Sequence, residues 1–86
     1  MNDEFDFRGK IDPMLTVDTV KKVMEYKAKM DAGEIKEDIV LAFTIDHQPA
    51  TRSIPDTLSK TGFGDYKVLR AKDRQLWRIV VTLKKT

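Results

Sequence analysis

The longest helical pattern in the chain runs from about Val17 to Ala32. Apolar residues recur there at spacings of three and four, which places them on one face of a helix. Thr16 or Asp18 can cap the first turn with a side-chain oxygen, and Gly33 can adopt the left-handed conformation that often ends a helix. The pattern predicts a core-facing stripe of Val20, Val23, Met24, Lys27 and Met30, flanked by Val17 and Tyr26.

Three further segments have the alternation or the apolar content of strands. Ile39–Asp46 is apolar on both faces, which is typical of an interior strand of a sheet. Tyr66–Lys72 and Leu76–Lys84 are separated by a turn at Asp73-Arg74, so they predict an antiparallel hairpin. Strict alternation places four side chains of the last strand on one face, which we expect to be buried: Trp77, Ile79, Val81 and Leu83.

A short helix is predicted between the first and second of these strands, over about Ile54–Lys60. Ser53 followed by Asp56 resembles a capping box, and Pro55 is tolerated in a first helical turn. Gly62 would end this helix, since glycine readily adopts the conformation that terminates one.

The N-terminal residues 1–13 are predicted to form a flexible arm, and residues 14–86 a single α/β domain. Phe5 and Phe7 are expected to pack against that domain, and the alternation over Glu4–Arg8 allows a short extra strand. The order helix-strand-helix-strand-strand indicates an α+β fold, a two-layer α/β sandwich with the helices on one face of the sheet.

Composition narrows the class of protein. The 86 residues include no cysteine, which excludes a disulfide framework and a thiolate metal site. Met1–Glu4 is acidic where a secretory signal would be basic, and no apolar run is long enough to span a membrane. We therefore expect a cytoplasmic protein without a membrane partner, either a monomer or a homodimer.

Charge is distributed unevenly along the chain. Residues 1–50 include 11 acidic and 7 basic side chains, whereas residues 51–86 include 3 acidic and 9 basic ones. A basic C-terminal hairpin can bind an acidic protein surface or nucleic acid, although lysine and arginine also keep exposed strands soluble. The candidate binding residues are Lys67, Arg70, Lys72, Arg74, Arg78 and Lys84.

Catalytic and cofactor chemistry has little support in the sequence. The only histidine, His47, follows Asp46, but no convincing nucleophile accompanies this pair. The Gly62-Phe63-Gly64-Asp65 segment follows a helix and precedes a strand, the reverse of a phosphate-binding loop. We expect a protein that is not an enzyme and that has no metal or other cofactor.

The second half of the chain, roughly Ile39 to Thr82, resembles the RraB family of ribonuclease E regulators. The segments that carry the resemblance are Thr44-Ile45-Asp46-His47, Leu58-Ser59-Lys60-Thr61-Gly62-Phe63, Tyr66-Lys67-Val68, and Leu76-Trp77-Arg78-Ile79-Val80-Val81-Thr82. The resemblance implies a ferredoxin-like fold and a regulatory protein whose partner is ribonuclease E. Two alternatives remain open: a small basic nucleic-acid-binding domain that uses the C-terminal hairpin, and a phage or accessory protein that masks a host enzyme.

Overall fold

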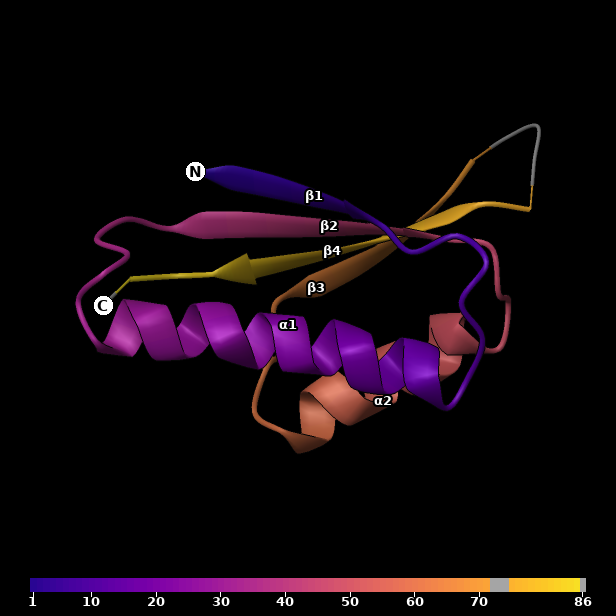
Figure 1. Cartoon of the computed structure of the whole chain (residues 1–86), viewed down its shortest axis with the longest axis horizontal. Helices are drawn as coiled ribbons and strands as arrows, with labels where there is room; N and C mark the ends of the chain where they lie inside the picture. Colours follow the sequence, from indigo (N-terminus) through magenta and orange to yellow (C-terminus); the bar gives the residue numbers. More distant parts are fainter. Residues whose placement is uncertain (72–74, 86) are drawn as a thin grey trace.

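Two helices and four strands form a two-layer α+β sandwich (Figure 1). The computed structural model describes residues 1–71 and 75–85. Its elements are, in chain order, β1 (Asn2–Asp6), α1 (Met14–Asp31), β2 (Ile39–Ile45), α2 (Ala50–Lys60), β3 (Tyr66–Arg70) and β4 (Trp77–Leu83). This confirms the predicted order of elements, and the extra strand that the alternation allowed at Glu4–Arg8 is present over Asn2–Asp6. The predicted turn at Asp73-Arg74 lies outside the described residues.

The sheet is mixed, with the strand order β1-β2-β4-β3. β1 runs parallel to β2, and β4 is antiparallel to both of its neighbours, β2 and β3. β4, the second strand of the hairpin, therefore lies between β2 and β3, and β3 lies at an edge of the sheet. The coarse prediction of an α+β sandwich is correct, but the ferredoxin-like arrangement is not confirmed by this strand order.

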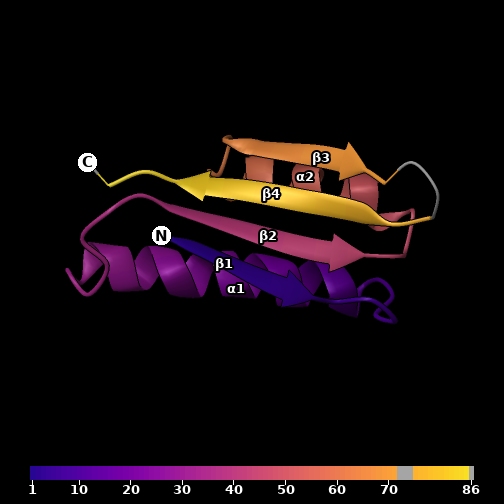
Figure 2. The same cartoon turned by 90° about the horizontal axis from the view of Figure 1, so that it is seen from above.

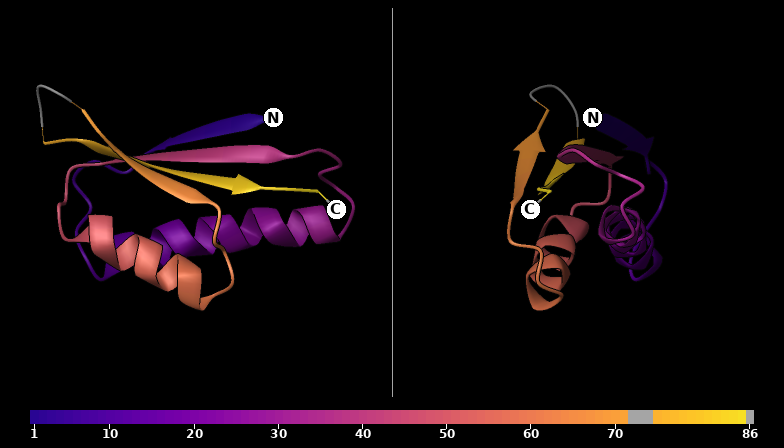
Figure 3. Two further views of the ribbon diagram at one scale, coloured as in Figure 1. Left: turned by 180° about the vertical axis from the view of Figure 1, so that it is seen from behind. Right: turned by 90° about the vertical axis from the view of Figure 1, so that its left-hand side faces the viewer.

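Both helices lie on the same face of the sheet, α1 along β1 and β2, and α2 along β3 and β4 (Figures 2 and 3). The core lies between the two layers. The alternation predicted for the last strand is confirmed, since its four apolar side chains are buried against the helices. None of the described helices is both long enough and apolar enough to cross a membrane.

Part of the N-terminal segment, where the alternation allowed a short strand, forms β1. The ring of Phe5 stacks on that of Phe43 at a centroid distance of 5.0 Å, and the ring of Phe7 lies 5.5 Å from the same partner. The amide of Phe7 also donates to the carbonyl of Thr44 at 2.8 Å. The two phenylalanines pack against the core, as expected, and so hold the N-terminal segment beside β2.

Helix α1 is rotated relative to the predicted stripe. It begins at Met14, and its buried face includes Leu15 and Thr19, which the three-four pattern did not include. Met24 and Val17 are instead exposed. The early start explains the difference, because the first turn packs Leu15 into the core and so sets which side of the helix faces inward.

Helix α2 begins at Ala50, four residues before the predicted start. Ala50, Ile54 and Leu58 are all fully buried. Because they are spaced four residues apart, one helix that includes all three places them on the same core-facing side. The predicted capping box is therefore absent from the start of the helix. Ser53 donates instead to the carbonyl of Pro49 at 3.2 Å, inside the first turns.

Tyr26 provides a test of the packing between α1 and β1. Burial, and secondly the hydrogen bond that its hydroxyl donates to Asp3, raise the pKa of Tyr26 to about 12. A raised pKa means that the folded state favours the neutral phenol, so this stabilisation is present below pH 10 and is lost as the pH rises through about 12. We expect an absorbance titration to show a tyrosine step near pH 12 that disappears in Tyr26→Phe and persists in Tyr66→Phe. A step unaffected by Tyr26→Phe would contradict this packing.

Candidate functional site

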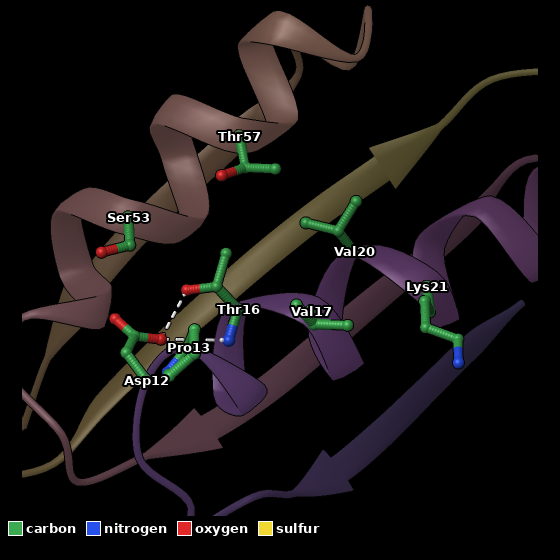
Figure 4. Close-up of a pocket in the computed structure, with 8 residues that line it drawn as sticks. All are labelled: Asp12, Pro13, Thr16, Val17, Val20, Lys21, Ser53 and Thr57. Atoms are coloured by element: carbon green, nitrogen blue, oxygen red, sulfur yellow. Dashed lines mark hydrogen bonds between the residues drawn. The ribbon is translucent and has the colours of Figure 1, made fainter.

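A pocket of about 410 Å³ lies between the first turns of α1 and the facing side of α2 (Figure 4). It combines one carboxylate with apolar walls, hydroxyl groups and one lysine. Its lining residues are Asp12, Pro13, Thr16, Val17, Val20, Lys21, Ser53 and Thr57. A concave site of mainly apolar lining with a few polar groups is the usual form of a binding site.

Asp12 is held in place by the start of α1. Its Oδ1 atom accepts a hydrogen bond from the backbone amide of Thr16 at 3.1 Å and another from the Thr16 hydroxyl at 2.6 Å. The first amides of a helix have no partner within the helix, so a carboxylate here satisfies one of them and also interacts favourably with the helix dipole. The Asp12–Pro13 peptide bond, just before the helix, is cis.

The carboxyl group of Asp12 is ionised at neutral pH. Burial alone would raise its pKa, but the hydrogen bonds from Thr16, the nearby hydroxyl of Ser53 and the proximity of His47 outweigh burial and lower the pKa below its usual value. The pocket is therefore anionic at the end where Asp12 lies.

The rest of the pocket is divided between the two helices. Val17 and Val20 of α1 form apolar walls, and Ser53 and Thr57 line the pocket from the facing side of α2, with the methyl group of Thr57 turned toward Val20 (Figure 4). Lys21 lies at the rim, and its side chain points away from α2. Such a site can hold a small apolar group that donates a hydrogen bond to the carboxylate.

Sequence reasoning missed this site. Asp12 was counted only as one charge of the N-terminal arm, and the cap of the helix was sought at Thr16 or Asp18. The available signal was the acidic residue and Pro13 immediately before the helix, a common arrangement at a helix start. Asp18 instead forms an ion pair with Lys10 at 3.1 Å.

The predicted basic surface is only partly assembled. The register pairs Arg70 with Trp77 and Arg78 with Leu69, so these two arginines point to opposite faces of the sheet. Arg78 forms an ion pair with Glu4 of β1 across the face that the two described helices do not cover. An arginine already paired within the chain is less available to a partner.

Two further predicted cations lie on or next to the hairpin. Lys67 lies on the same face of the hairpin as Arg78, and Lys84 lies 3.9 Å from a carboxylate oxygen of Asp65. Lys72 and Arg74 lie outside the described residues. Among the predicted cations that the structure describes, Arg70 lies on the face of the sheet opposite Lys67 and Arg78.

Among the described residues, no hydrogen bond joins the side chains of Asp46 and His47. The Oδ1 atom of Asp46 accepts a hydrogen bond from the amide of Gly9 at 3.0 Å, which attaches the loop after β1 to the end of β2. This carboxylate therefore has a structural role.

Comparison with known proteins identifies the family. A protein of Archaeoglobus fulgidus named "Putative sulfur carrier protein" is 30% identical to this chain over 83 residues, which make up 96% of this chain and 83% of that protein. No family model and no solved structure matches the chain. At this identity and coverage, the chain belongs to the family of that sulfur carrier protein.

This relationship corrects the function expected from the RraB resemblance. The prediction of a ribonuclease regulator is wrong, and so is ribonuclease E as the candidate partner, because a relative that spans nearly the whole chain is named as a putative sulfur carrier. The two alternatives, a nucleic-acid-binding domain and a protein that masks a host enzyme, are set aside for the same reason. A helix ended by glycine and followed by a hairpin is common to many α/β folds, so the motifs behind the resemblance had little specificity.

Proposed function

We propose that this chain works in sulfur transfer as a docking protein, and that the sulfur remains on a thiol of its partner. Two observations support the proposal. The chain belongs to the family of a protein named as a sulfur carrier, and its 86 residues contain no cysteine. The second observation carries the argument, because it removes the side chain on which a protein most simply holds transferable sulfur.

The transfer of sulfur from a persulfide requires a thiol on the recipient. A recipient thiolate attacks the outer sulfur of a donor persulfide, a new S–S bond forms on the recipient, and the donor leaves as a thiolate. One sulfur atom moves and no external oxidant is consumed. The four methionines cannot replace the thiol, because a thioether has no S–H group to ionise.

The pocket next to α1 agrees with a binding role better than with catalysis. A general base acts best when its pKa lies near the working pH, whereas the pKa of Asp12 is lowered from an already acidic value. The carboxylate is instead suited to accept a hydrogen bond from a bound group. We therefore propose a protein that positions a sulfur-bearing partner and does not catalyse the transfer.

Intact-mass measurement tests whether the chain itself takes up sulfur. The chain is incubated with a cysteine desulfurase and cysteine, with and without ATP and a carboxylate-activating enzyme, and the Archaeoglobus relative is treated in parallel as the control for sulfur uptake. We expect the mass of this chain to stay unchanged. A gain of one sulfur atom, or the exchange of one oxygen for sulfur as in a thiocarboxylate, would overturn the proposal.

Competition tests the docking half of the proposal. An excess of this chain should slow the loading of the Archaeoglobus relative, because both proteins would occupy the same surface of the donor enzyme. Loading at an unchanged rate with a large excess of the chain would contradict a docking role.

A further inference from the structure

The outer face of α1 carries an apolar stripe that points to solvent. Met14, Val17 and Met24 are 58%, 44% and 50% exposed, and the exposed residue Ala28 continues the same line. Lys21 lies in the middle of the stripe. The five positions follow one another at spacings of three, four, three and four, on the side of the helix opposite Leu15, Thr19 and Val23.

This spacing is the pattern by which one helix packs against another. Alternating steps of three and four form the seam of a coiled coil, where side chains of one helix fit between those of its partner. Isolated exposed apolar residues are ordinary on protein surfaces, but here they lie in one row along a single helix. The row is continuous with the pocket, because Val17 and Lys21 belong to both.

The charges along the stripe specify the partner's chemistry. No carboxylate of the described residues forms an ion pair with Lys21, whereas Asp18 and Glu25, on one flank of the stripe, are paired with Lys10 and Lys22 at 3.1 and 3.0 Å. A lysine in an apolar seam favours an acidic residue at the facing position.

A second copy of the chain does not meet this requirement. A two-fold axis through the middle of the stripe would bring the Lys21 side chains of the two copies together. This contact joins like charges, which opposes association.

We infer that the outer face of α1 docks an amphipathic helix of a sulfur-transfer partner, with an acidic side chain of that helix opposite Lys21. The identity of the partner rests on the proposed function, whereas the surface and the chemistry of the docked helix rest on α1 alone.

Designed peptides test the surface without any sulfur enzyme. The probe is a fluorescent helical peptide of three heptads with leucine in the seam and glutamate at the central seam position, and a second peptide carries lysine there. By fluorescence anisotropy the glutamate peptide should bind the full chain more tightly than the lysine peptide. Lys21→Glu should weaken binding of the glutamate peptide about tenfold and reverse the preference. Arg52→Glu, a charge reversal on the exposed side of α2, should change neither peptide's affinity.

Competition assays with two variants of the α1 stripe, Lys21→Glu and Met24→Asp, separate this inference from the proposed function. If Lys21→Glu and Met24→Asp compete for the donor enzyme as well as the unchanged chain does, the surface is refuted and the docking function stands. If the chain never competes but the peptides show the charge-reversal pattern, the proposed function fails and the surface stands. Absence of binding by either peptide, or self-association in sedimentation that Met24→Asp abolishes, would overturn the inference.

Discussion

Replacing Phe43 by alanine should lower the free energy of unfolding by about 3–5 kcal/mol. Phe43 is fully buried in β2, and both Phe5 and Phe7 pack their rings on it. Truncation leaves a cavity and also removes the surface that holds β1 to the sheet. Because domains of this size are stabilised by only about 5–15 kcal/mol, the variant should be partly unfolded under mild conditions.

Urea unfolding followed by the fluorescence of Trp77 measures this loss, and amide hydrogen exchange shows where it acts. The amides of β1 should lose more protection than those of β4, because only β1 depends directly on the aromatic contact. Phe43→Leu fills most of the space and should cost less than about 1.5 kcal/mol. A loss below about 1 kcal/mol for Phe43→Ala would show that the aromatic cluster does not hold β1.

Replacing Asp12 by alanine should cost about 2 kcal/mol at neutral pH, from the loss of charge-assisted hydrogen bonds at the start of α1. The pH dependence follows from the direction of the pKa shift. Because the folded state lowers the pKa of Asp12 from its usual value of 3.8, the ionised group stabilises the fold above that pH. The contribution is lost as the pH falls through the lower pKa of the folded state.

Unfolding free energies at pH 7 and pH 3 measure this effect for the unchanged chain and for two variants. Asp12→Asn keeps an oxygen that can accept the bonds from Thr16 and lacks the charge, so it should lose less stability than alanine and lack this pH dependence. Glu34→Gln, at an exposed loop carboxylate, should leave the stability unchanged. An equal loss for Asp12→Ala at both pH values would contradict an ionised cap.

The absence of cysteine changes what family membership means for this chain. The relative is named as a putative sulfur carrier, whereas this chain has no thiol and its pocket next to α1 holds a carboxylate. A carboxylate can accept a hydrogen bond or pair with a cation, but it cannot accept sulfur by thiol exchange. Under the proposed function, this chain contributes the recognition of partners, and the sulfur chemistry takes place on them.

The limits of sequence reasoning are clearest at α1. Periodicity correctly predicted a helix here, since an amphipathic pattern needs no knowledge of the rest of the fold. It could not decide which side faces the core, because two apolar stripes lie on this helix and only the packing of Leu15 against the sheet selects one. Met24 was therefore expected in the core and is instead part of the exposed stripe.

The sequence by itself determined the elements, the alternation of the last strand, the absence of a thiol and the uneven charge, since each depends on residue type and local spacing. Tertiary structure decided the rest. The N-terminal segment lies beside β2 because Phe5 and Phe7 pack on Phe43, which is 38 and 36 residues away in the sequence. The pocket exists because Asp12 and Ser53, 41 residues apart, meet where two helices begin side by side. Strand register places Arg70 on the face of the sheet opposite Lys67 and Arg78, because neighbouring residues of a strand point to opposite faces.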